Sequence, residues 1–142
     1  MNDWKEFPAA TDNFYEMLEY VMAAADESGM SVKQQMRLEL GFEEAAANII
    51  NYAYGEGGGS IQIRTYANGE KFFVELKDNG EQFNPLEVDK SEDRGSTIED
   101  AKVGGLGISF MRRIFDEMTY HYGNEGELFY NRLKLGMKLA SA

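Results

Sequence analysis

Three short groups of residues in this sequence have the types and the spacing to do chemistry. The first is Glu44 with Asn48, four positions apart and therefore one above the other on a helix. A carboxylate can act as a general base toward water or a hydroxyl group. An Asn carbonyl oxygen suits Mg²⁺, which keeps several waters and bridges substrate phosphates. Taken alone, however, the pair is better explained as the solvated polar edge of a helix.

The second group is Asp78 with Gly80, directly after a segment with the composition of a strand. An aspartate at a strand end can accept a hydrogen bond from an exocyclic amine such as that of adenine. A glycine two residues later lets a planar ring approach the backbone. Taken alone, the same residues are typical of a plain turn after a strand.

The third group is a glycine-rich run before a helical pattern, formed by Gly104, Gly105, Leu106 and Gly107. Free backbone N–H groups at a helix start can bind phosphate oxygens, and the helix dipole assists them. A glycine-rich run alone is equally compatible with a hinge. The order of the three groups along the chain favours one shared site over three unrelated features.

The helix that carries the first group is predicted over residues 36–54 and is apolar on two sides, so we expect it to be buried between two layers. The apolar residues on one side are Met36, Leu40, Ala47, Ile50 and Tyr54, and those on the other are Leu38, Phe42, Ala45 and Ile49. A narrow polar stripe between the two sides holds Arg37, Glu44, Asn48 and Asn51. Glu43 points toward the Met36 side, which favours Glu44 as the base.

The remaining elements surround this helix in sequence. A short edge strand is expected within residues 4–10, then a first helix capped by Thr11, Asp12 or Asn13, and a capping box formed by Ser31 and Gln34 opens the long helix. Alternating residues 60–66 and 71–77 predict a hairpin, because Asn68 and Gly69 lie between them. A third helix with an apolar stripe follows. Two strands then end the chain, 118–122 and 128–139, with a turn at residues 123–126. The stripe consists of Ile108, Met111, Ile114 and Phe115.

This order of elements predicts an α+β fold, a two-layer sandwich with a mostly antiparallel sheet of four to five strands covered by three helices. We expect a single domain over residues 1–142, with a polar lid at about residues 84–103.

The composition limits the function classes. Fourteen Lys and Arg residues stand against 25 Asp and Glu, a formal charge of −11, and there is no cysteine. Such a chain repels nucleic acid and anionic membranes unless its basic residues cluster, and along the sequence they do not. The absence of cysteine fits a reducing cytosol. Since no signal peptide or membrane span is evident, we expect a cytoplasmic protein with no nucleic-acid or membrane partner.

At its three groups the sequence resembles the histidine-kinase-like (GHKL) ATPases with the Bergerat ATP-binding fold, and among them the small anti-sigma factor serine/threonine-protein kinases. Residues 44–54 resemble the N box of that family, residues 78–85 its G1 box and residues 104–107 its G2 box. The run Asp116, Glu117 and Met118 is similar to the small-kinase subgroup. The similarity extends from the first helix to the last strand.

This resemblance implies ATP and Mg²⁺ as cofactors and a role for each residue. Glu44 would be the general base and Asn48 the Mg²⁺ ligand. Asp78 would recognise the adenine amino group, with Gly80 beneath the ring. The glycine-rich run would bind the cofactor, with Gly105 and Gly107 holding the lid and the phosphates.

The resemblance also implies a function: an anti-sigma factor that phosphorylates a serine of an anti-anti-sigma (STAS-type) protein, binds a sigma factor and forms a homodimer. A nucleotide-binding regulatory module without kinase activity is the alternative, and an interaction domain that has lost nucleotide is a third. Glu44 favours the kinase, because holding a nucleotide requires no base. Asn48, Asp78 and Gly107 count against the third.

Three positions depart from the family pattern. Tyr52 stands where a basic residue is common, and Gln82 replaces the second glycine of the G1 box. No threonine is evident on the final strands, where Asn131 is the candidate replacement. The absence of a histidine before the N box counts against a sensor histidine kinase.

Overall fold

The computed structural model describes residues 3–54, 58–87 and 105–139, and only the backbone within 105–108. Its strands are β1 Lys5–Pro8, β2 Ser60–Asn68, β3 Lys71–Asp78, β4 Glu117–Glu125 and β5 Leu128–Lys138. Its α-helices are α1 Phe14–Glu27, α2 Val32–Asn48 and α4 Gly105–Ile114. Three shorter helical segments are η1 Thr11–Asn13, η2 Ile49–Tyr54 and η4 Pro85–Glu87.

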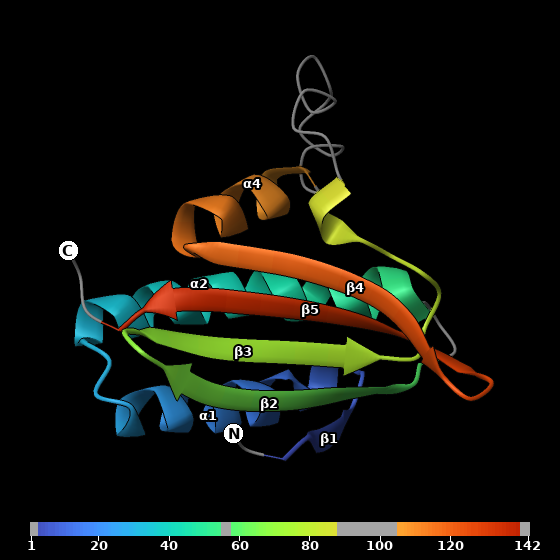
Figure 1. The fold of residues 1–142 in the computed structure, drawn as a ribbon, viewed down its shortest axis with the longest axis horizontal. Helices are drawn as coiled ribbons and strands as arrows, with labels where there is room; N and C mark the ends of the chain where they lie inside the picture. Colours follow the sequence, from blue (N-terminus) through green and yellow to red (C-terminus); the bar gives the residue numbers. More distant parts are fainter. Residues whose placement is uncertain (1–2, 55–57, 88–104, 140–142) are drawn as a thin grey trace.

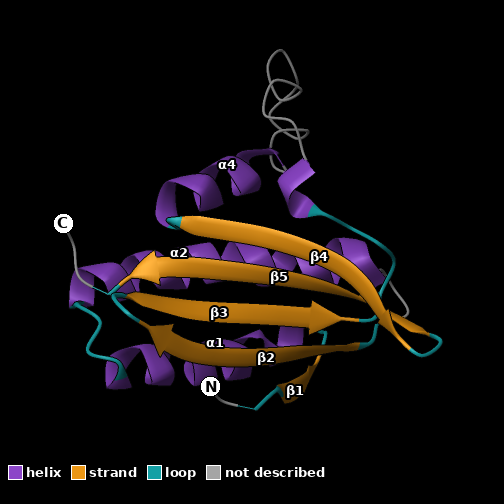
Figure 2. Cartoon of the chain, viewed as in Figure 1, coloured by secondary structure: helices purple, strands orange, loops and turns teal. Residues whose placement is uncertain are grey.

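The five strands form one sheet in the order β1-β2-β3-β5-β4, with every neighbouring pair antiparallel. Helices α1 and α2 lie side by side behind the sheet, and α4 lies next to α2 near the edge strand β4 (Figure 1). Strands and helices therefore form two layers (Figure 2). This arrangement confirms the predicted α+β sandwich.

The hairpin predicted at Asn68 and Gly69 is confirmed, since β2 and β3 pair up to Asn68 opposite Lys71. Gly69 has a φ of 67°, a conformation that favours glycine. The second hairpin differs from its prediction, because β4 continues to Glu125 and only residues 126–127 turn. Gly126, with a φ of 66°, is the glycine that this turn requires.

The long helix was predicted to be one α-helix, and this is wrong for its last part. Helix α2 begins at a Ser31 cap, whose Oγ accepts a hydrogen bond from the Gln34 N–H at 3.2 Å. From Ile49 to Tyr54 the backbone is a π-helix. There the carbonyl of Ala53 accepts a hydrogen bond at 2.8 Å from the N–H of Glu81, in the loop after β3. The end of this helix is thus tied to the sheet.

Two capping predictions also need correction. The Gln34 side chain donates to the Lys138 carbonyl at 3.0 Å and so ties α2 to the last strand, leaving the capping box half formed. The N-cap of α1 is Asn13, and its side chain makes no capping bond.

Burial of α2 on two sides is a further prediction that the structure contradicts. The side that faces the sheet is buried, with Leu38 and Phe42 at 1% and 0% exposure. On the other side Met36 is 66% exposed and Leu40 48% exposed. The physical reason is that the single sheet covers one face of α2 while α1 and α4 flank it. The described residues provide no layer over the remaining face.

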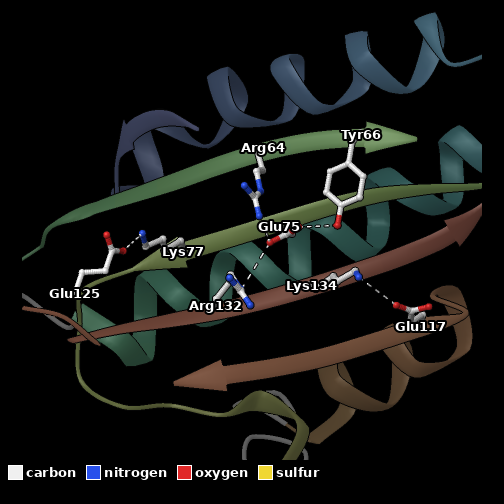
Figure 3. Close-up of polar contacts among 8 residues, drawn as sticks. All are labelled: Arg64, Tyr66, Glu75, Lys77, Glu117, Glu125, Arg132 and Lys134. Atoms are coloured by element: carbon white, nitrogen blue, oxygen red, sulfur yellow. Dashed lines mark hydrogen bonds and ion pairs between the residues drawn. The ribbon is translucent and has the colours of Figure 1, made fainter. Parts of the chain in front are cut away.

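The sheet face turned away from the helices carries a network of charged side chains (Figure 3). Glu75, only 3% exposed, accepts hydrogen bonds from Arg64 at 3.1 Å and from the Tyr66 hydroxyl at 2.6 Å. Arg132 approaches the same carboxylate to 3.7 Å. Other ion pairs on this face join Lys77 to Glu125, and Lys71 and Lys134 to Glu117.

These contacts correct the expectation that the basic residues do not cluster. Strand pairing brings together five of the 14 Lys and Arg residues from segments far apart in sequence. Each of the five is paired with one of three carboxylates within this face, Glu75, Glu117 and Glu125, so most of the positive charge of the cluster is offset there.

None of the described helices is both long enough and apolar enough to cross a membrane. Of the lid expected at residues 84–103, only 84–87 fall within the described residues, and they include η4.

Candidate functional site

A small pocket lies where the end of β3 meets α2, β4 and β5. Its described lining residues are Ala45, Asn48, Ile49, Asp78, Phe83, Pro85, Tyr120, Asn131 and Leu133. The space open to the centre of a water-sized sphere is about 10 Å³, enough for one water molecule. Because ligand pockets usually measure hundreds of Å³, a larger ligand requires the side chains of the loop after β3 to move.

Asp78 is the charged group of this pocket and is 3% exposed. Its Oδ1 accepts hydrogen bonds from the Gly80 N–H and from the Asn131 Nδ2, both at 2.9 Å. Burial raises the pKa of the Asp78 carboxyl, and the bonds from Asn131 and Gly80 partly offset this increase. Among the described residues all hydrogen bonds to this carboxylate go to Oδ1, so Oδ2 is left as an acceptor for a ligand donor.

Asn131 occupies the centre of the pocket and holds several of its walls together. Its Nδ2 also donates to the Glu81 carbonyl at 2.9 Å, and its Oδ1 accepts from the Phe83 N–H at 3.0 Å and from the Tyr120 hydroxyl. The replacement of a threonine by Asn131, suggested by the sequence, is consistent with this position beside Asp78. Neither Tyr120 nor Phe83 was singled out from the sequence, since their partner lies 11 and 48 positions away.

Asn48 lies in the wall that α2 contributes, and it is 8% exposed. Its Nδ2 is buried and has no hydrogen-bond partner among the residues that the structure describes. A buried amide group left unpaired costs about 1–3 kcal/mol, so an unpaired group in a pocket indicates a polar ligand there. Because Nδ2 is a donor, the matching ligand atom is a hydrogen-bond acceptor, such as a phosphate oxygen of ATP.

Glu44 lies one turn before Asn48 on α2 and is half-buried, but it is not among the side chains that line the pocket. Burial, and secondarily the negative charge of Glu43, raises the pKa of the Glu44 carboxyl. A carboxylate with a raised pKa is a stronger base. Glu43 is exposed and lines a different groove, in agreement with the direction expected for it.

Gly80 has a structural role that the sequence did not indicate. A Cβ at this position would lie 2.3 Å from the Ala53 carbonyl oxygen. Only glycine therefore permits the loop after β3 to contact the end of the α2 region. Its expected position beneath a planar ring stays a prediction.

Other polar-stripe residues lie outside the pocket. Asn51 is exposed and lines the same groove as Glu43. Arg37 donates to the Arg113 carbonyl at 2.9 Å, near the end of α4. Tyr52 packs against Phe83 with ring centroids 5.5 Å apart, at the edge of the pocket.

The glycine-rich run is described in part. Gly105, Leu106 and Gly107 form the first turn of α4, where backbone N–H groups have no partner within the helix. Gly104 lies outside the described residues. The helix start predicted from the sequence is therefore confirmed, and its contact with phosphate stays a prediction.

The buried acid, the unpaired amide and the glycine-rich helix start lie on one α+β sandwich. A family model described as the histidine kinase-like ATPase domain matches residues 7–130, and the chain belongs to this family. ATP binding is implied by membership of that family.

Among curated relatives, the serine-protein kinase RsbW of Listeria monocytogenes is 30% identical over 103 residues, which are 69% of this chain and 65% of that protein. RsbW of Listeria innocua is 29% identical over the same share of both chains. The chain thus spans about two thirds of the length of these curated relatives.

Solved structures share the fold at low sequence identity. The SiaB–SiaC complex from Pseudomonas aeruginosa superposes with a TM-score of 0.61 at 16% identity, over 94% of this chain and 89% of that chain. The catalytic domain of the histidine kinase ThkA superposes with a TM-score of 0.50 at 16% identity, over 99% and 100%. These similarities confirm the fold class.

Proposed function

We propose that this protein is an ATP-dependent anti-sigma factor kinase that phosphorylates a serine of an anti-anti-sigma (STAS-type) protein and sequesters a sigma factor. The observation that carries the nucleotide site is the buried Asp78 carboxylate, held by Asn131 with Oδ2 left as an acceptor. The kinase activity is supported by the relatives named serine-protein kinase RsbW and by Glu44 on the same helix as Asn48.

Each residue has one task in this proposal. Asp78 accepts a hydrogen bond from the adenine amino group, which selects adenine over guanine because guanine has a carbonyl at that position. Asn48 holds Mg²⁺ through its amide oxygen. The N–H groups of the first turn of α4 bind phosphate oxygens. Glu44 takes the proton of the attacking serine hydroxyl.

ATP would supply the phosphoryl group, and Mg²⁺ would supply the positive charge that neutralises its oxygens. Within the described residues no three His, Asp or Glu side chains lie close enough to hold a metal ion. Asn48 alone among the candidate residues would thus contact the ion, with phosphates and waters completing its ligands. We also propose that the protein acts in the cytoplasm as a homodimer.

Nucleotide binding is tested by thermal unfolding with Mg-ATP. A ligand present at 100 times its Kd stabilises the folded state by about 2.7 kcal/mol, so the Tm should rise. Asp78→Asn should abolish the increase, because the amide offers a donor where an acceptor is needed. No increase with the unmutated chain would refute the nucleotide site.

Phosphate transfer is tested with labelled ATP and candidate antagonist proteins encoded nearby. Glu44→Gln should retain the Mg-ATP-induced Tm increase and lose transfer by at least about a hundredfold, the typical contribution of a general base. Glu70→Gln, which removes one carboxylate at the exposed β2–β3 turn, is the matched control and should retain transfer. Undiminished transfer by Glu44→Gln would refute the base assignment.

A nucleotide-binding regulator without kinase activity is the second candidate, and one observation favours it: Glu44 does not line the pocket. For this candidate, Mg-ATP raises the Tm while no antagonist becomes labelled. The partner protein would then bind with an affinity that depends on nucleotide.

A further inference from the structure

A groove lies between the start of α1 and the second half of α2. Its volume, measured for the centre of a water-sized sphere, is about 420 Å³. The volume of the Asp78 pocket, measured in the same way, is about 10 Å³. Phe14, Tyr15 and Leu18 of α1 form one wall, and Ala47 with Ile50 forms the other. Helices α1 and α2 run side by side here (Figure 1). The two walls of the groove are therefore mainly apolar, and Thr11, Glu39, Glu43 and Asn51 are the polar residues of its lining.

An exposed apolar stripe continues this groove along α2. Val32, Met36 and Leu40 lie one turn apart and are 74%, 66% and 48% exposed. The same helix face continues to Ala47 and Ile50. At a rise of 1.5 Å per residue, the face from position 32 to position 50 is about 27 Å long, the length of a helix of about 18 residues. Tyr15, 77% exposed, stands beside the groove.

The charges that line the groove have one sign. Glu39 and Glu43 both line the groove, and its described lining contains no Lys or Arg. An occupant must therefore offset two carboxylates while it covers the apolar residues. A second copy of this chain would place like charges against each other in a molecule that already carries a formal charge of −11. Charge complementarity thus disfavours self-association through this face.

We propose that this face of α2, with the α1–α2 groove, is a docking site for a basic amphipathic helix of a partner protein. Such a helix places apolar residues at i, i+3, i+4 and i+7 in the groove and along the Val32–Leu40 stripe. Lys or Arg residues flanking its apolar face pair with Glu39 and Glu43. The docking site does not require that the Asp78 pocket binds nucleotide.

The groove and the pocket share one helical segment, which provides coupling between them. Asn48 faces the pocket, while its neighbours Ala47 and Ile50 line the groove. The charge of Glu43 also contributes to the raised pKa of Glu44. A cation placed against Glu43 by the partner would lower the pKa of Glu44. Occupancy of the groove and of the pocket should therefore affect each other reciprocally.

The test uses the full chain and a fluorescein-labelled synthetic peptide of about 18 residues, with Leu on one helix face and Lys and Arg on its flanks. Fluorescence anisotropy measures its Kd against that of a scrambled peptide of the same composition and of a peptide with Glu in place of Lys and Arg. We expect the amphipathic basic peptide to bind at least about tenfold more tightly than either, a difference of about 1.4 kcal/mol. Equal binding of the scrambled or the acidic peptide would overturn the proposal.

Protein variants locate the binding. Tyr15→Ser removes an exposed aromatic residue and should weaken binding at least about fivefold, as should the charge reversal Glu43→Lys. Glu70→Lys changes the net charge equally at the exposed β2–β3 turn and should change the Kd less than about twofold. An equal loss in Glu70→Lys would mean nonspecific attraction to an acidic protein, and the docking site would be refuted.

Sedimentation velocity tests whether the groove is instead occupied by a second copy of this chain. With the peptide absent, the unmutated chain and Tyr15→Ser should show the same oligomeric state, since the groove faces a partner of another kind. A dimer that dissociates in Tyr15→Ser would identify a second copy as the occupant and overturn the proposal. Peptide binding and sedimentation velocity are both measured without ATP. The docking site can therefore be refuted while the nucleotide site is retained, and the nucleotide site can be refuted while the docking site is retained.

Discussion

At the scale of single residues, Asp78 carries a charge that burial makes unfavourable and that a hydrogen-bond donor of a ligand would offset. Asp78 is buried at the end of β3, and burial raises its pKa above the ordinary value of 3.8. The folded state therefore binds a proton more tightly than the unfolded chain does. By linkage, the free energy of unfolding decreases as pH rises from 3.8 through the raised pKa, and the loss is fully present at neutral pH.

We therefore predict that Asp78→Asn is more stable than the unmutated chain at pH 7, although it loses the response to Mg-ATP. The stability difference should shrink as pH falls toward 3.8, because protonation removes the charge from the native carboxyl. Urea unfolding at a series of pH values measures this difference. Asp12→Asn, at an exposed carboxylate in η1, is the control and should show no such trend. A less stable Asp78→Asn at pH 7 would contradict the prediction.

Glu75 on the opposite sheet face is a second buried carboxylate, but there the fold itself provides the partners. Arg64, Arg132 and the Tyr66 hydroxyl surround it. Burial together with Glu75 raises the pKa of Tyr66 to about 12. The partners of Glu75 thus lie within the fold, whereas Oδ2 of Asp78 accepts no hydrogen bond from the described part of the chain.

We predict that Glu75→Gln lowers the pKa of Tyr66 part of the way toward its ordinary value of 10.0, because the negative charge is removed while burial remains. The measurement is a spectrophotometric titration of tyrosinate, taken as the difference between each chain and its Tyr66→Phe counterpart. Glu117→Gln, on the same face but further from Tyr66, should lower it less. An unchanged Tyr66 titration in Glu75→Gln would show that burial alone accounts for the shift.

At the scale of elements, the site depends on a junction between the end of the α2 region and the loop after β3. The Ala53 carbonyl accepts a hydrogen bond from Glu81, and the N–H of Asn79 donates to the Tyr54 hydroxyl at 2.8 Å. Gly80 fits between them because it has no Cβ. The π-helical turn and the glycine together hold the end of the α2 region against the loop after β3.

We predict that Gly80→Ala lowers the free energy of unfolding by about 2 kcal/mol, the usual cost of forcing atoms into a packed contact. The neighbouring Cβ would meet backbone, which cannot rotate away as a side chain can. Gln82→Ala, exposed in the same loop, should cost less than about 0.5 kcal/mol. Urea unfolding compares the three chains. Equal stability of Gly80→Ala would mean that the junction opens freely.

At the scale of the whole molecule, charge is distributed unevenly. Five basic side chains are paired on the open sheet face, while the chain as a whole carries 25 acidic residues against 14 basic ones. The rest of the molecule is therefore strongly acidic, and repulsion among those carboxylates opposes the compact state. The helical layer, with Glu39 and Glu43, belongs to this acidic part.

We predict that the Tm rises between about 10 mM and 200 mM NaCl, because salt screens this repulsion over a distance of about 10 Å. Salt also weakens the ion pairs on the sheet face turned away from the helices. These pairs are partly buried, so salt changes them less than it changes the repulsion among exposed carboxylates. Differential scanning calorimetry measures the trend. Replacement of Glu70 and Glu127 by Gln, both exposed, should reduce the salt response, and a Tm that falls with salt would contradict the prediction.

Local pattern was sufficient for much of the fold. Period, turn residues and the Ser31 cap predicted the helices, the Asn68–Gly69 hairpin and the two layers, because these features depend on neighbours within a few positions. Two boundaries were wrong: the turn after β4, where β4 continues three residues further than predicted, and the end of α2, which depends on contacts with a distant segment. The Ala53 carbonyl, for example, bonds to Glu81 across the fold.

The sequence by itself determined the three groups of residues and their order, and hence the class of nucleotide site to look for. Only the tertiary structure decided how they meet: Asn131 joins Asp78 from 53 positions away, while Glu44 lies outside the pocket. It also decided that one apolar face of α2 is left uncovered and that scattered basic residues gather on one sheet face. The reason is physical: hydrogen-bond partners and burial depend on which segments pack together, and neither is encoded in the spacing of one segment.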